Sequence, residues 1–369
     1  MKILVLSSHT LSLFWFRIDM MQEFIKKGYI VTAVGSDPEN NWKDEFEKNG
    51  INYRYINVDR TSKNILRDIK TFFTLYNLIK EEKPDKIFMY QAKTVVYGSL
   101  AAKLNRIEDI YPLIAGLGSV LGGTGIKNKI LKKIMKIGYS FACKYSKKVF
   151  FQNEDDKKEF IDSGLISNEK CIIINGSGVN LEIFKPKPLP EKPAFLFIGR
   201  LIKDKGLIEY LEACKKIKKK FPYVRCLLVG PYDINASAIT PDELKPYIDN
   251  KIIEYFGFQS DVKPYISQSS TFVLPSYHEG TPKTILEAMA MGRSIITTNA
   301  PGCKETVIDG LNGYLVEVKD IFGLVNKMEY LILNSDMNKK MGDLSLRIVR
   351  KKYDVNIVNQ KIMQEMEVV

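Results

Sequence analysis

The sequence is poor in the residues that build metal centres and disulfide frameworks. Its 369 residues include five cysteines and two histidines, and no Cys-x-x-Cys pair occurs. Scattered cysteines in odd number do not form the paired framework of a small secreted domain, and zinc sites need closely spaced Cys or His ligands. We therefore expect no disulfide scaffold, no zinc site and no bound cofactor. This cysteine usage favours a reducing cytoplasm.

Long hydrophobic runs are also missing. No stretch of about 18 apolar residues occurs, so the sequence predicts no transmembrane helix. The N-terminal MKILVLSSH has the short basic start of a secretion signal, but it lacks a long apolar core and a small-residue cleavage site. We interpret it as a first buried strand. With 45% hydrophobic and 27% charged residues, the composition is that of an ordinary globular protein.

Acidic residues are absent from residues 110–153, although the whole chain carries a net charge of +12. Between Lys127 and Lys148, eight lysines are interleaved with Ile, Leu, Met, Tyr and Phe. This pattern predicts an amphipathic basic helix suited to an anionic membrane surface, and a solvated helix face is the alternative. We expect no nucleic-acid binding, because the lysines concentrate in one stretch without an RNA-binding motif.

Short apolar runs alternate with helical patterns in the first half. The predicted strands are residues 2–8, 30–35, 86–90, 111–118, 148–153 and 171–178, and helical patterns include 17–28 and 66–84. Continuously apolar strands separated by helices indicate a parallel sheet covered on both faces. Residues 1–184 are therefore predicted as one doubly wound α/β domain.

A proline-rich stretch, KPKPLPEKP at residues 185–193, interrupts this alternation. Four prolines in nine residues exclude a helix or a central strand, so we predict a stiff interdomain linker. Predicted strands then resume at residues 194–200, 224–231, 252–258, 271–276, 293–299 and 312–317, with a helix at 206–221. We expect a second doubly wound domain over 194–352 and a helix at about 353–369 that packs back on the first. Two such domains would form a ligand cleft at the carboxyl ends of their sheets.

One strand-to-helix turn in the second half combines glycine with two cations. In FIGRLIKDKGLIEYL, an apolar strand ends at Gly199, Arg200 follows, and Lys205 precedes an amphipathic helix. A helix N-terminus presents unpaired N–H groups and attracts anions. Arg200 would add a planar fork and Lys205 a mobile charge, so the pair could clamp a diphosphate. Ordinary loop cations are the alternative.

A second strand-to-helix turn lies in HEGTPKTILEAMAMG, at residues 278–292. Thr281 as N-cap and Pro282 as first helical residue would suit a helix start there. The amides around Gly280 would then face the cleft, and Thr284 could donate to a phosphate.

Two acids, Glu279 and Glu287, flank this turn with seven residues between them. Glu287 lies among apolar residues, where an acid needs a partner, and carboxylates accept hydrogen bonds from ribose hydroxyls. The alternatives are a Glu279 that merely stabilises the helix dipole and a Glu287 on the surface.

The motifs GRL-x3-KG, E-x7-E, PS-x2-EG-x-P and EAMAMG together resemble the retaining glycosyltransferases of family four. INGSGVNLEIF (174–184) and PGCKETVIDGLNGYLVE (301–317) are similar to that family's hinge and to its sequence after the second acid. SHTLSLFWFR (8–17), GLGS (116–119) and FQNEDDKKEF (151–160) resemble bacterial members that add an N-acetylhexosamine to a polyprenyl-diphosphate-linked sugar. The resemblance implies the GT-B fold, in which two Rossmann-like α/β domains face each other across a cleft.

The resemblance also implies a nucleotide-sugar donor, most often UDP-linked. Arg200 and Lys205 would hold its diphosphate and stabilise the charge that develops on bond breaking, and Glu279 would contact the sugar; these three are the candidate catalytic residues. Glu287 would bind the ribose. The donor-binding candidates are Gly199, Arg200, Lys205, Gly257, Phe258, Glu279, Gly280, Thr281, Pro282, Thr284 and Glu287. Lys283 departs from the family pattern and puts the local sugar contacts in doubt.

Retention implies attack of the acceptor hydroxyl on the same face that the phosphate leaves, so that the phosphate can take the proton. No D-x-D motif occurs in a fitting context, so we expect no metal ion. The acceptor-binding candidates lie in the first domain: His9, Arg17, Lys93, Gly116, Gly118 and Ser119. His9 follows the first predicted strand, and an ordinary loop histidine is the alternative. Arg17, at the predicted start of a helix, is the stronger candidate for an acceptor diphosphate.

The sequence thus predicts a hexosyltransferase of capsule, surface polysaccharide or protein-glycan assembly. We expect it in the cytoplasm, peripherally attached to the inner face of the cell membrane. Two alternatives stay open. One is a soluble glycosyltransferase that acts on a diffusible acceptor, and the other is a nucleotide-sugar-binding protein without catalytic activity.

Overall fold

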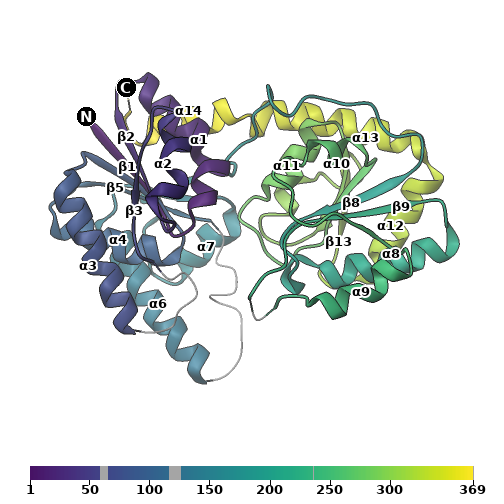
Figure 1. Ribbon diagram of the computed structural model, residues 1–369, viewed down its shortest axis with the longest axis horizontal. Coiled ribbons are helices and arrows are strands. Elements are labelled where there is room, and N and C mark those ends of the chain that lie inside the picture. The colour runs from purple at the N-terminus through teal and green to yellow at the C-terminus, as the bar shows by residue number, and fades with distance from the viewer. Residues whose placement is uncertain (59–64, 116–125, 236, 369) are drawn as a thin grey trace. The chain divides into compact units, whose positions relative to one another are not determined.

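The computed structural model describes residues 1–58, 65–115, 126–235 and 237–368 of the chain. The chain divides into two compact units, one formed by Met1–Ser177 with Val355–Val369 and the other by Gly178–Asp354 (Figure 1). Each unit contains a sheet whose described strands all pair in parallel. The predicted class, α/β with two doubly wound Rossmann-like domains, is confirmed.

The first unit has a seven-stranded sheet in the order β3-β2-β1-β4-β5-β6-β7. Its strands are β1 (Lys2–Ser7), β2 (Ile30–Gly35), β3 (Asn52–Tyr55), β4 (Lys86–Tyr90), β5 (Asp109–Ile114), β6 (Val149–Phe151) and β7 (Cys171–Ile173). Its helices are α1 (Thr10–Lys26), α2 (Glu39–Glu47), α3 (Ile65–Glu82), α4 (Ala92–Leu104), α6 (Ile126–Tyr145), α7 (Glu154–Asp162) and α14 (Val355–Glu365). Alternate residues of a strand point to opposite faces, so Leu4 and Val5 join different apolar clusters. Both faces are therefore buried, as the continuous apolar strands predict.

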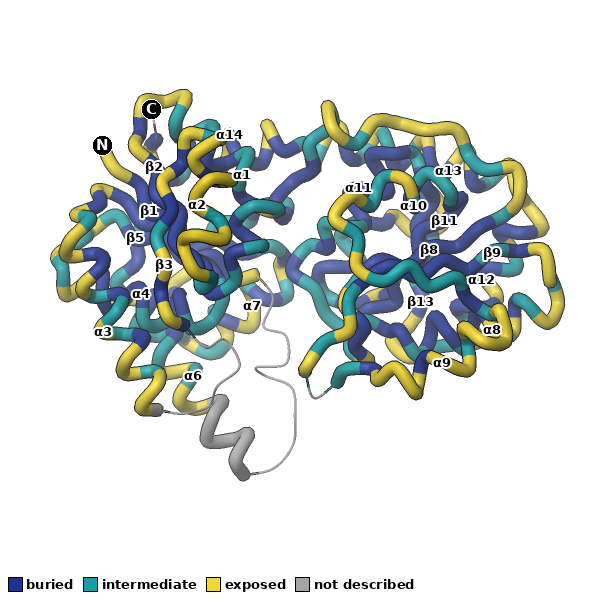
Figure 2. Tube along the Cα trace, viewed as in Figure 1, coloured by how far each residue is buried: buried dark blue, intermediate teal, exposed yellow. Residues whose placement is uncertain are grey.

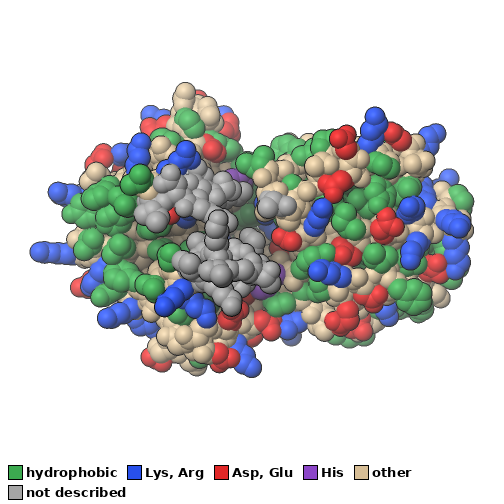
Figure 3. Space-filling view, turned by 90° about the horizontal axis from the view of Figure 1, so that it is seen from below, with side chains coloured by type: hydrophobic (Ala, Val, Ile, Leu, Met, Phe, Trp, Pro, Cys, Tyr) green, Lys and Arg blue, Asp and Glu red, His purple; other side chains and the backbone are tan. Residues whose placement is uncertain are grey.

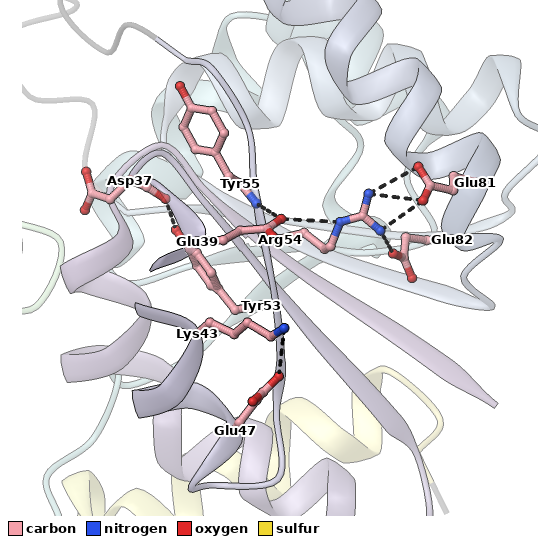
Figure 4. Close-up of polar contacts among 9 residues, drawn as sticks. All are labelled: Asp37, Glu39, Lys43, Glu47, Tyr53, Arg54, Tyr55, Glu81 and Glu82. Atoms are coloured by element: carbon pink, nitrogen blue, oxygen red, sulfur yellow. Dashed lines mark hydrogen bonds and ion pairs between the residues drawn. The ribbon is translucent and has the colours of Figure 1, made fainter. Parts of the chain in front are cut away.

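The edge strand β3 is not predicted by the sequence pattern, because Asn-Tyr-Arg-Tyr is short and polar. Polar contacts hold it in place (Figure 4). Arg54 donates to Glu82 at 2.5 Å and to Glu81 at 3.1 Å, both at the end of α3. The Tyr53 hydroxyl donates to the carbonyl oxygen of Asp37 at 2.7 Å. Charged side chains on a short edge strand also discourage pairing with other chains.

Some predicted element boundaries in this unit are wrong. Helix α1 begins at Thr10 rather than at residue 17, because only two residues separate it from β1. Arg17 therefore lies in the second turn of the helix and not at its start. Strand β5 spans Asp109–Ile114 and so begins before the predicted residue 111, while residues 116–118 of that prediction lie outside the described residues. Helix α6 ends at Tyr145 rather than at Lys148.

The C-terminal helix α14 belongs to the first unit and packs against α1. Its buried Val358 and Ile362 join the same apolar cluster as Leu13 and Met20 of α1. The chain thus returns to the first unit after the second unit is complete.

The second unit has a six-stranded sheet in the order β10-β9-β8-β11-β12-β13. Its strands are β8 (Ala194–Ile198), β9 (Arg225–Val229), β10 (Glu254–Tyr255), β11 (Thr271–Leu274), β12 (Ser294–Thr298) and β13 (Gly313–Val316). Its helices are α8 (Leu207–Lys220), α9 (Pro241–Asp249), α10 (Lys263–Ser267), α11 (Lys283–Ala290), α12 (Ile321–Leu333) and α13 (Ser335–Ile348). Figure 2 shows the sheet of each unit in the buried class, with exposed residues on outer helix faces and loops.

The proline-rich stretch at residues 185–193 lies inside the second unit, whose first residue is Gly178. Arg293, which is fully buried, donates to the carbonyl oxygens of Lys187 at 2.9 Å and Pro188 at 3.0 Å. Proline-rich segments lack N–H donors but keep their carbonyl acceptors, so a guanidinium can bind them to a domain. The boundary between compact units accordingly lies before this stretch rather than at it.

Candidate functional site

Three glycines meet at the carboxyl end of the sheet in the second unit. Gly199 follows β8, Gly230 follows β9, and Gly257 follows β10. A Cβ atom on Gly230 would lie 1.8 Å from the carbonyl oxygen of Gly199. The Gly230 N–H donates to the carbonyl oxygen of Gly257 at 2.8 Å. Gly230 has φ 149° and Gly257 has φ 66°, values that favour glycine. The turns after β8 and β9 therefore approach each other closely only because Gly230 has no side chain.

Two further glycines join the turns that carry the candidate catalytic residues. Gly206, with φ 71°, precedes α8, and a Cβ there would lie 2.0 Å from the carbonyl oxygen of Pro275. Gly302 has φ 79°, and a Cβ there would lie 2.2 Å from the carbonyl oxygen of Glu279. The turns after β8, β11 and β12 thus pack backbone against backbone.

The charged candidates on these turns form two ion pairs. Arg200 donates from Nη1 to Asp233 at 2.7 Å. Lys205 forms an ion pair between its Nζ and Oε1 of Glu279. Each cation is therefore held by a carboxylate from a neighbouring turn at the carboxyl end of the same sheet. A diphosphate entering here would meet two oriented cations, which supports a clamp on a doubly charged group.

Sequence reasoning missed several side chains that support this edge. Asp233, the partner of Arg200, lies three residues after Gly230. An acid so close after a glycine at a strand end is the sequence signal that could have identified it. The Tyr277 hydroxyl donates to Glu209 Oε1 at 2.6 Å, and Glu209 is 6% exposed in the first turn of α8. Burial, together with this carboxylate, raises the pKa of Tyr277 well above its usual value. These contacts join the turn after β11 to α8.

Helix α11 begins one residue later than predicted. Pro282 is the N-cap, Lys283 is the first helical residue, and no side-chain hydrogen bond from the N-cap is present. The predicted Thr281 cap is therefore wrong, because Pro282 has an extended ψ of 109° and so lies outside the helix.

Glu287 is a buried acid and not a surface one. It is 8% exposed on α11, among the fully buried Leu286 and Ala288. Burial raises the pKa of Glu287 to about 7, Lys283 opposes that rise, and Asp261 adds to it. The unusual Lys283 thus acts electrostatically on Glu287 from one helical turn away. A carboxylate kept in such surroundings suits a ligand that donates hydrogen bonds to it.

The acceptor candidates lie at the carboxyl end of the sheet in the first unit, as far as the structure describes them. His9 lies two residues after the end of β1 and is the N-cap of α1. Lys93 lies in the first turn of α4 and donates to Asp68 at 2.7 Å. Gly116, Gly118 and Ser119 lie outside the described residues.

Arg17 is the most unusual of the acceptor candidates. It is 3% exposed, and its guanidinium carbon lies 5.4 Å from the ring centre of Phe88 and 5.5 Å from that of Tyr90. Burial lowers the pKa of Arg17 to about 10, which still leaves it charged at neutral pH. Its Nε and Nη1 have no hydrogen-bond partner among the described residues. A buried cation without an acceptor is costly, so an anion is the expected partner.

Helix α6 presents an amphipathic outer face over the part whose side chains are described. Ile134 and Ile137 are 55% and 63% exposed, next to the exposed Lys133 and Lys136. Figure 3 shows hydrophobic side chains beside Lys and Arg on the surface of the first unit. Among the described residues, no helix combines the length and the apolarity that crossing a bilayer requires. The described residues also include no group of three or more Cys, His, Asp or Glu side chains arranged to bind a metal ion.

Two family models match the chain. The model described as "Glycosyl transferases group 1" matches residues 179–345, and the model described as "Glycosyl transferase 4-like" matches residues 2–153. The two matches correspond to the second and first units. Each falls on a doubly wound sheet with candidate site residues at its carboxyl edge.

Curated relatives include three bacterial enzymes. N,N'-diacetylbacillosaminyl-diphospho-undecaprenol alpha-1,3-N-acetylgalactosaminyltransferase of Campylobacter jejuni is 26% identical over 99% of this chain and 98% of its own length. UDP-Gal:alpha-D-GlcNAc-diphosphoundecaprenol alpha-1,3-galactosyltransferase of Escherichia coli is 28% identical over 72% and 70%. The capsular polysaccharide biosynthesis glycosyltransferase CapM of Staphylococcus aureus is 24% identical over 81% and 80%.

Solved structures share the fold. A glycosyltransferase from Rickettsia africae aligns with a TM-score of 0.77 at 22% identity, covering 100% of this chain and 98% of its own. The Anabaena protein HepE, solved in complex with UDP-glucose, aligns with a TM-score of 0.78 at 18% identity over 100% of both chains.

Proposed function

Because the chain belongs to the group 1 glycosyltransferases, we propose that it transfers a sugar from a UDP-linked donor to a polyprenyl-diphosphate-linked saccharide. The observation that carries this proposal is the set of paired charges at one sheet edge, Arg200 with Asp233 and Lys205 with Glu279. The named acceptors of the Campylobacter and Escherichia relatives, both linked through a diphosphate to undecaprenol, support the lipid-linked acceptor. The Anabaena complex supports a UDP-sugar. The name of the Campylobacter relative supports an N-acetylhexosamine as the transferred sugar.

The second unit binds the donor in this proposal. Arg200 and Lys205 take the diphosphate, Glu279 contacts the sugar, and the buried Glu287 accepts from the ribose hydroxyls. The glycine turns at Gly199 and Gly257 give the nucleotide close access to the backbone. A nucleotide sugar carries its diphosphate between the hydroxyls of the sugar and those of the ribose, so it can satisfy both the cations and the acids at this end of the sheet.

Transfer with retention requires little acid–base chemistry from the protein. As the bond between the sugar and the phosphate breaks, negative charge grows on the phosphate, and Arg200 and Lys205 stabilise it electrostatically. The acceptor hydroxyl attacks from the face that the phosphate leaves, and its proton passes to the phosphate oxygen. Because two side-chain cations neutralise the leaving group, we expect the reaction to need no metal ion.

The first unit binds the acceptor in this proposal. Arg17 supplies a buried cation that lacks an acceptor among the described residues, which suits the acceptor diphosphate. His9 and Lys93 lie near the ends of β1 and β4 and are placed to contact the saccharide. Gly116, Gly118 and Ser119 stay candidates from the sequence alone.

Sugar transfer is the direct test. The protein is incubated with radiolabelled UDP-N-acetylgalactosamine and with GlcNAc-diphosphoundecaprenol or the bacillosamine-linked acceptor of the Campylobacter relative, and label extracted into organic solvent is counted. We expect labelled lipid that depends on both substrates. UDP binding with no turnover on either acceptor would favour the non-catalytic alternative. Full transfer by both the Arg200→Ala and Glu279→Ala variants would show that this site is misplaced.

Peripheral attachment to an anionic membrane is part of the proposal and has its own test. The apolar face of α6, flanked by lysines, should bind vesicles that contain phosphatidylglycerol, and high salt should weaken this binding. Ile134→Glu with Ile137→Glu should abolish flotation with the vesicles while UDP binding is retained. A wild-type protein that stays with the soluble fraction at low salt would favour the alternative of a diffusible acceptor.

A further inference from the structure

Gln91 adopts a backbone conformation that a residue with a side chain rarely takes. It directly follows β4 and has φ 73° and ψ 142°. Glycine occupies this region freely, whereas a Cβ atom crowds it. Strained residues of this kind cluster at functional sites, where the rest of the structure holds them in place. The chain thus keeps glutamine where glycine would fit the turn better.

The side chain of Gln91 is oriented and yet accessible. Gln91 is the N-cap residue of α4, but it does not cap that helix. Its Oε1 instead accepts hydrogen bonds from the hydroxyl of Ser8 at 2.6 Å and from that of Ser7 at 3.0 Å, both buried. Among the described residues, its Nε2 reaches only the Oγ of Ser12, at 3.5 Å. Since the amide has two N–H donors, at least one is available to a ligand at this half-exposed position.

The buried Arg17, whose Nε and Nη1 have no hydrogen-bond partner among the described residues, is an independent sign of a ligand at the same end of the sheet. Its guanidinium lies over the ring of Tyr90, the residue that precedes Gln91. The Tyr90 hydroxyl lies 2.9 Å from Ser12 Oγ, which in turn lies 3.0 Å from Ser7 Oγ. The parallel pairing of β1 and β4 sets Ser7 opposite Tyr90 and so fixes this network. At this end of the sheet, Arg17 therefore offers a site for an anion, and Gln91, next to Tyr90, offers an amide donor for a hydroxyl group.

We propose that Gln91 is a specificity-determining residue that donates a hydrogen bond to a hydroxyl group of the acceptor saccharide. Arg17 binds the diphosphate to which that saccharide is attached. This inference rests on the proposed function, because it assigns a part of the acceptor to a residue of the first unit. A sugar linked to a diphosphate carries a hydroxyl group and an anion close together, which is the combination that Gln91 and Arg17 can bind.

The variant Gln91→Glu removes the amide donor and adds a negative charge, whereas Gln91→Gly removes the donor without adding charge. A carboxylate keeps the size of the side chain and can still accept from Ser7 and Ser8, but it has no N–H. We expect the KM for GlcNAc-diphosphoundecaprenol to rise about 10- to 100-fold, with UDP affinity and UDP-sugar hydrolysis unchanged. Gln91→Gly should show the same loss together with an equal or higher melting temperature, because glycine relieves the strained φ.

Lys83→Gly is the matched control for strain relief. Lys83 has φ 48° and directly follows α3. It lies before the amino end of β4, whereas Gln91 follows the carboxyl end of that strand. Its replacement should leave acceptor KM at the wild-type value. An increase in KM for Lys83→Gly as large as that for Gln91→Gly would overturn the assignment, because general changes in the sheet would then explain both.

Deoxy acceptors identify the hydroxyl group to which Gln91 donates its hydrogen bond. GlcNAc-diphosphoundecaprenol is prepared lacking, in turn, each hydroxyl other than the one glycosylated. One derivative should lose about tenfold or more in kcat/KM with the wild type and less than about twofold with Gln91→Gly. Equal losses in both proteins for every derivative would contradict the proposal while leaving the transferase function intact. Absence of transfer by the wild type to any diphosphate-linked acceptor would overturn both.

Discussion

Lys205→Ala is expected to lower kcat for sugar transfer about 100- to 1,000-fold. Charge develops on the phosphate as the sugar leaves, and removing one preorganised donor to a developing charge typically costs this much. Lys205 comes from the turn before α8 and is aligned by Glu279, so its ammonium is positioned before the donor arrives. The measurement is single-turnover transfer at saturating donor, which separates the chemical step from binding.

Lys203→Ala is the control for Lys205→Ala. Lys203 lies in the same turn but pairs with Glu243 at 3.0 Å, in contact with solvent. An exposed ion pair contributes little to stability, so this variant should fold and transfer sugar like the wild type. Comparable losses of kcat in both variants would point to damage of the turn rather than to a role of Lys205 in catalysis.

The strands that support the two sites are predicted well from the sequence, because parallel sheets buried on both faces leave continuous apolar runs. The run AFLFI gives β8, and TFVL gives β11. Strand β3 is missed because its pairing depends on Arg54 and its distant acidic partners. The proline-rich stretch is misjudged for the same reason, since Arg293, which binds it, lies about 100 residues away in the chain.

The donor candidates can be proposed from the sequence because their spacing is local. Arg200 and Lys205 share one turn, and Glu279 and Glu287 share another. Residues that act through tertiary contacts are not predictable in this way. Asp233 becomes relevant only once β9 lies beside β8. Gln91 is recognised by its backbone angles, which no spacing in the sequence reveals.

Glu287→Gln is expected to stabilise the protein at pH 8 while weakening its affinity for UDP. In the folded protein, burial raises the pKa of Glu287 from 4.5 to about 7. The raised pKa means that the fold prefers the protonated acid. Stability that is fully present below pH 4.5 is therefore lost as the pH rises to 7 and beyond, by about 3 kcal/mol in total. Glutamine carries no charge at any pH and avoids this loss.

The stability difference should depend on pH in a defined direction. Below about pH 4.5, wild type and Glu287→Gln should unfold at similar temperatures. Above pH 7, the variant should melt several degrees higher. Glu191→Gln removes the same charge from an exposed position of the second unit and should shift the melting temperature little at either pH. A Glu287→Gln protein that is less stable than the wild type at pH 8 would contradict the burial argument.

Affinity for UDP should change in the opposite sense. Ribose hydroxyls donate to a carboxylate more strongly than to a neutral amide or a protonated acid, so Glu287→Gln should weaken UDP binding about 10- to 100-fold at pH 8. Wild-type affinity, measured by calorimetry, should rise as the pH increases from 6 to 8, because more of Glu287 is then ionised. The variant should lose this dependence. Ionised Glu287 thus lowers the stability of the fold but strengthens donor binding. These two results together would explain its burial by donor binding rather than by folding.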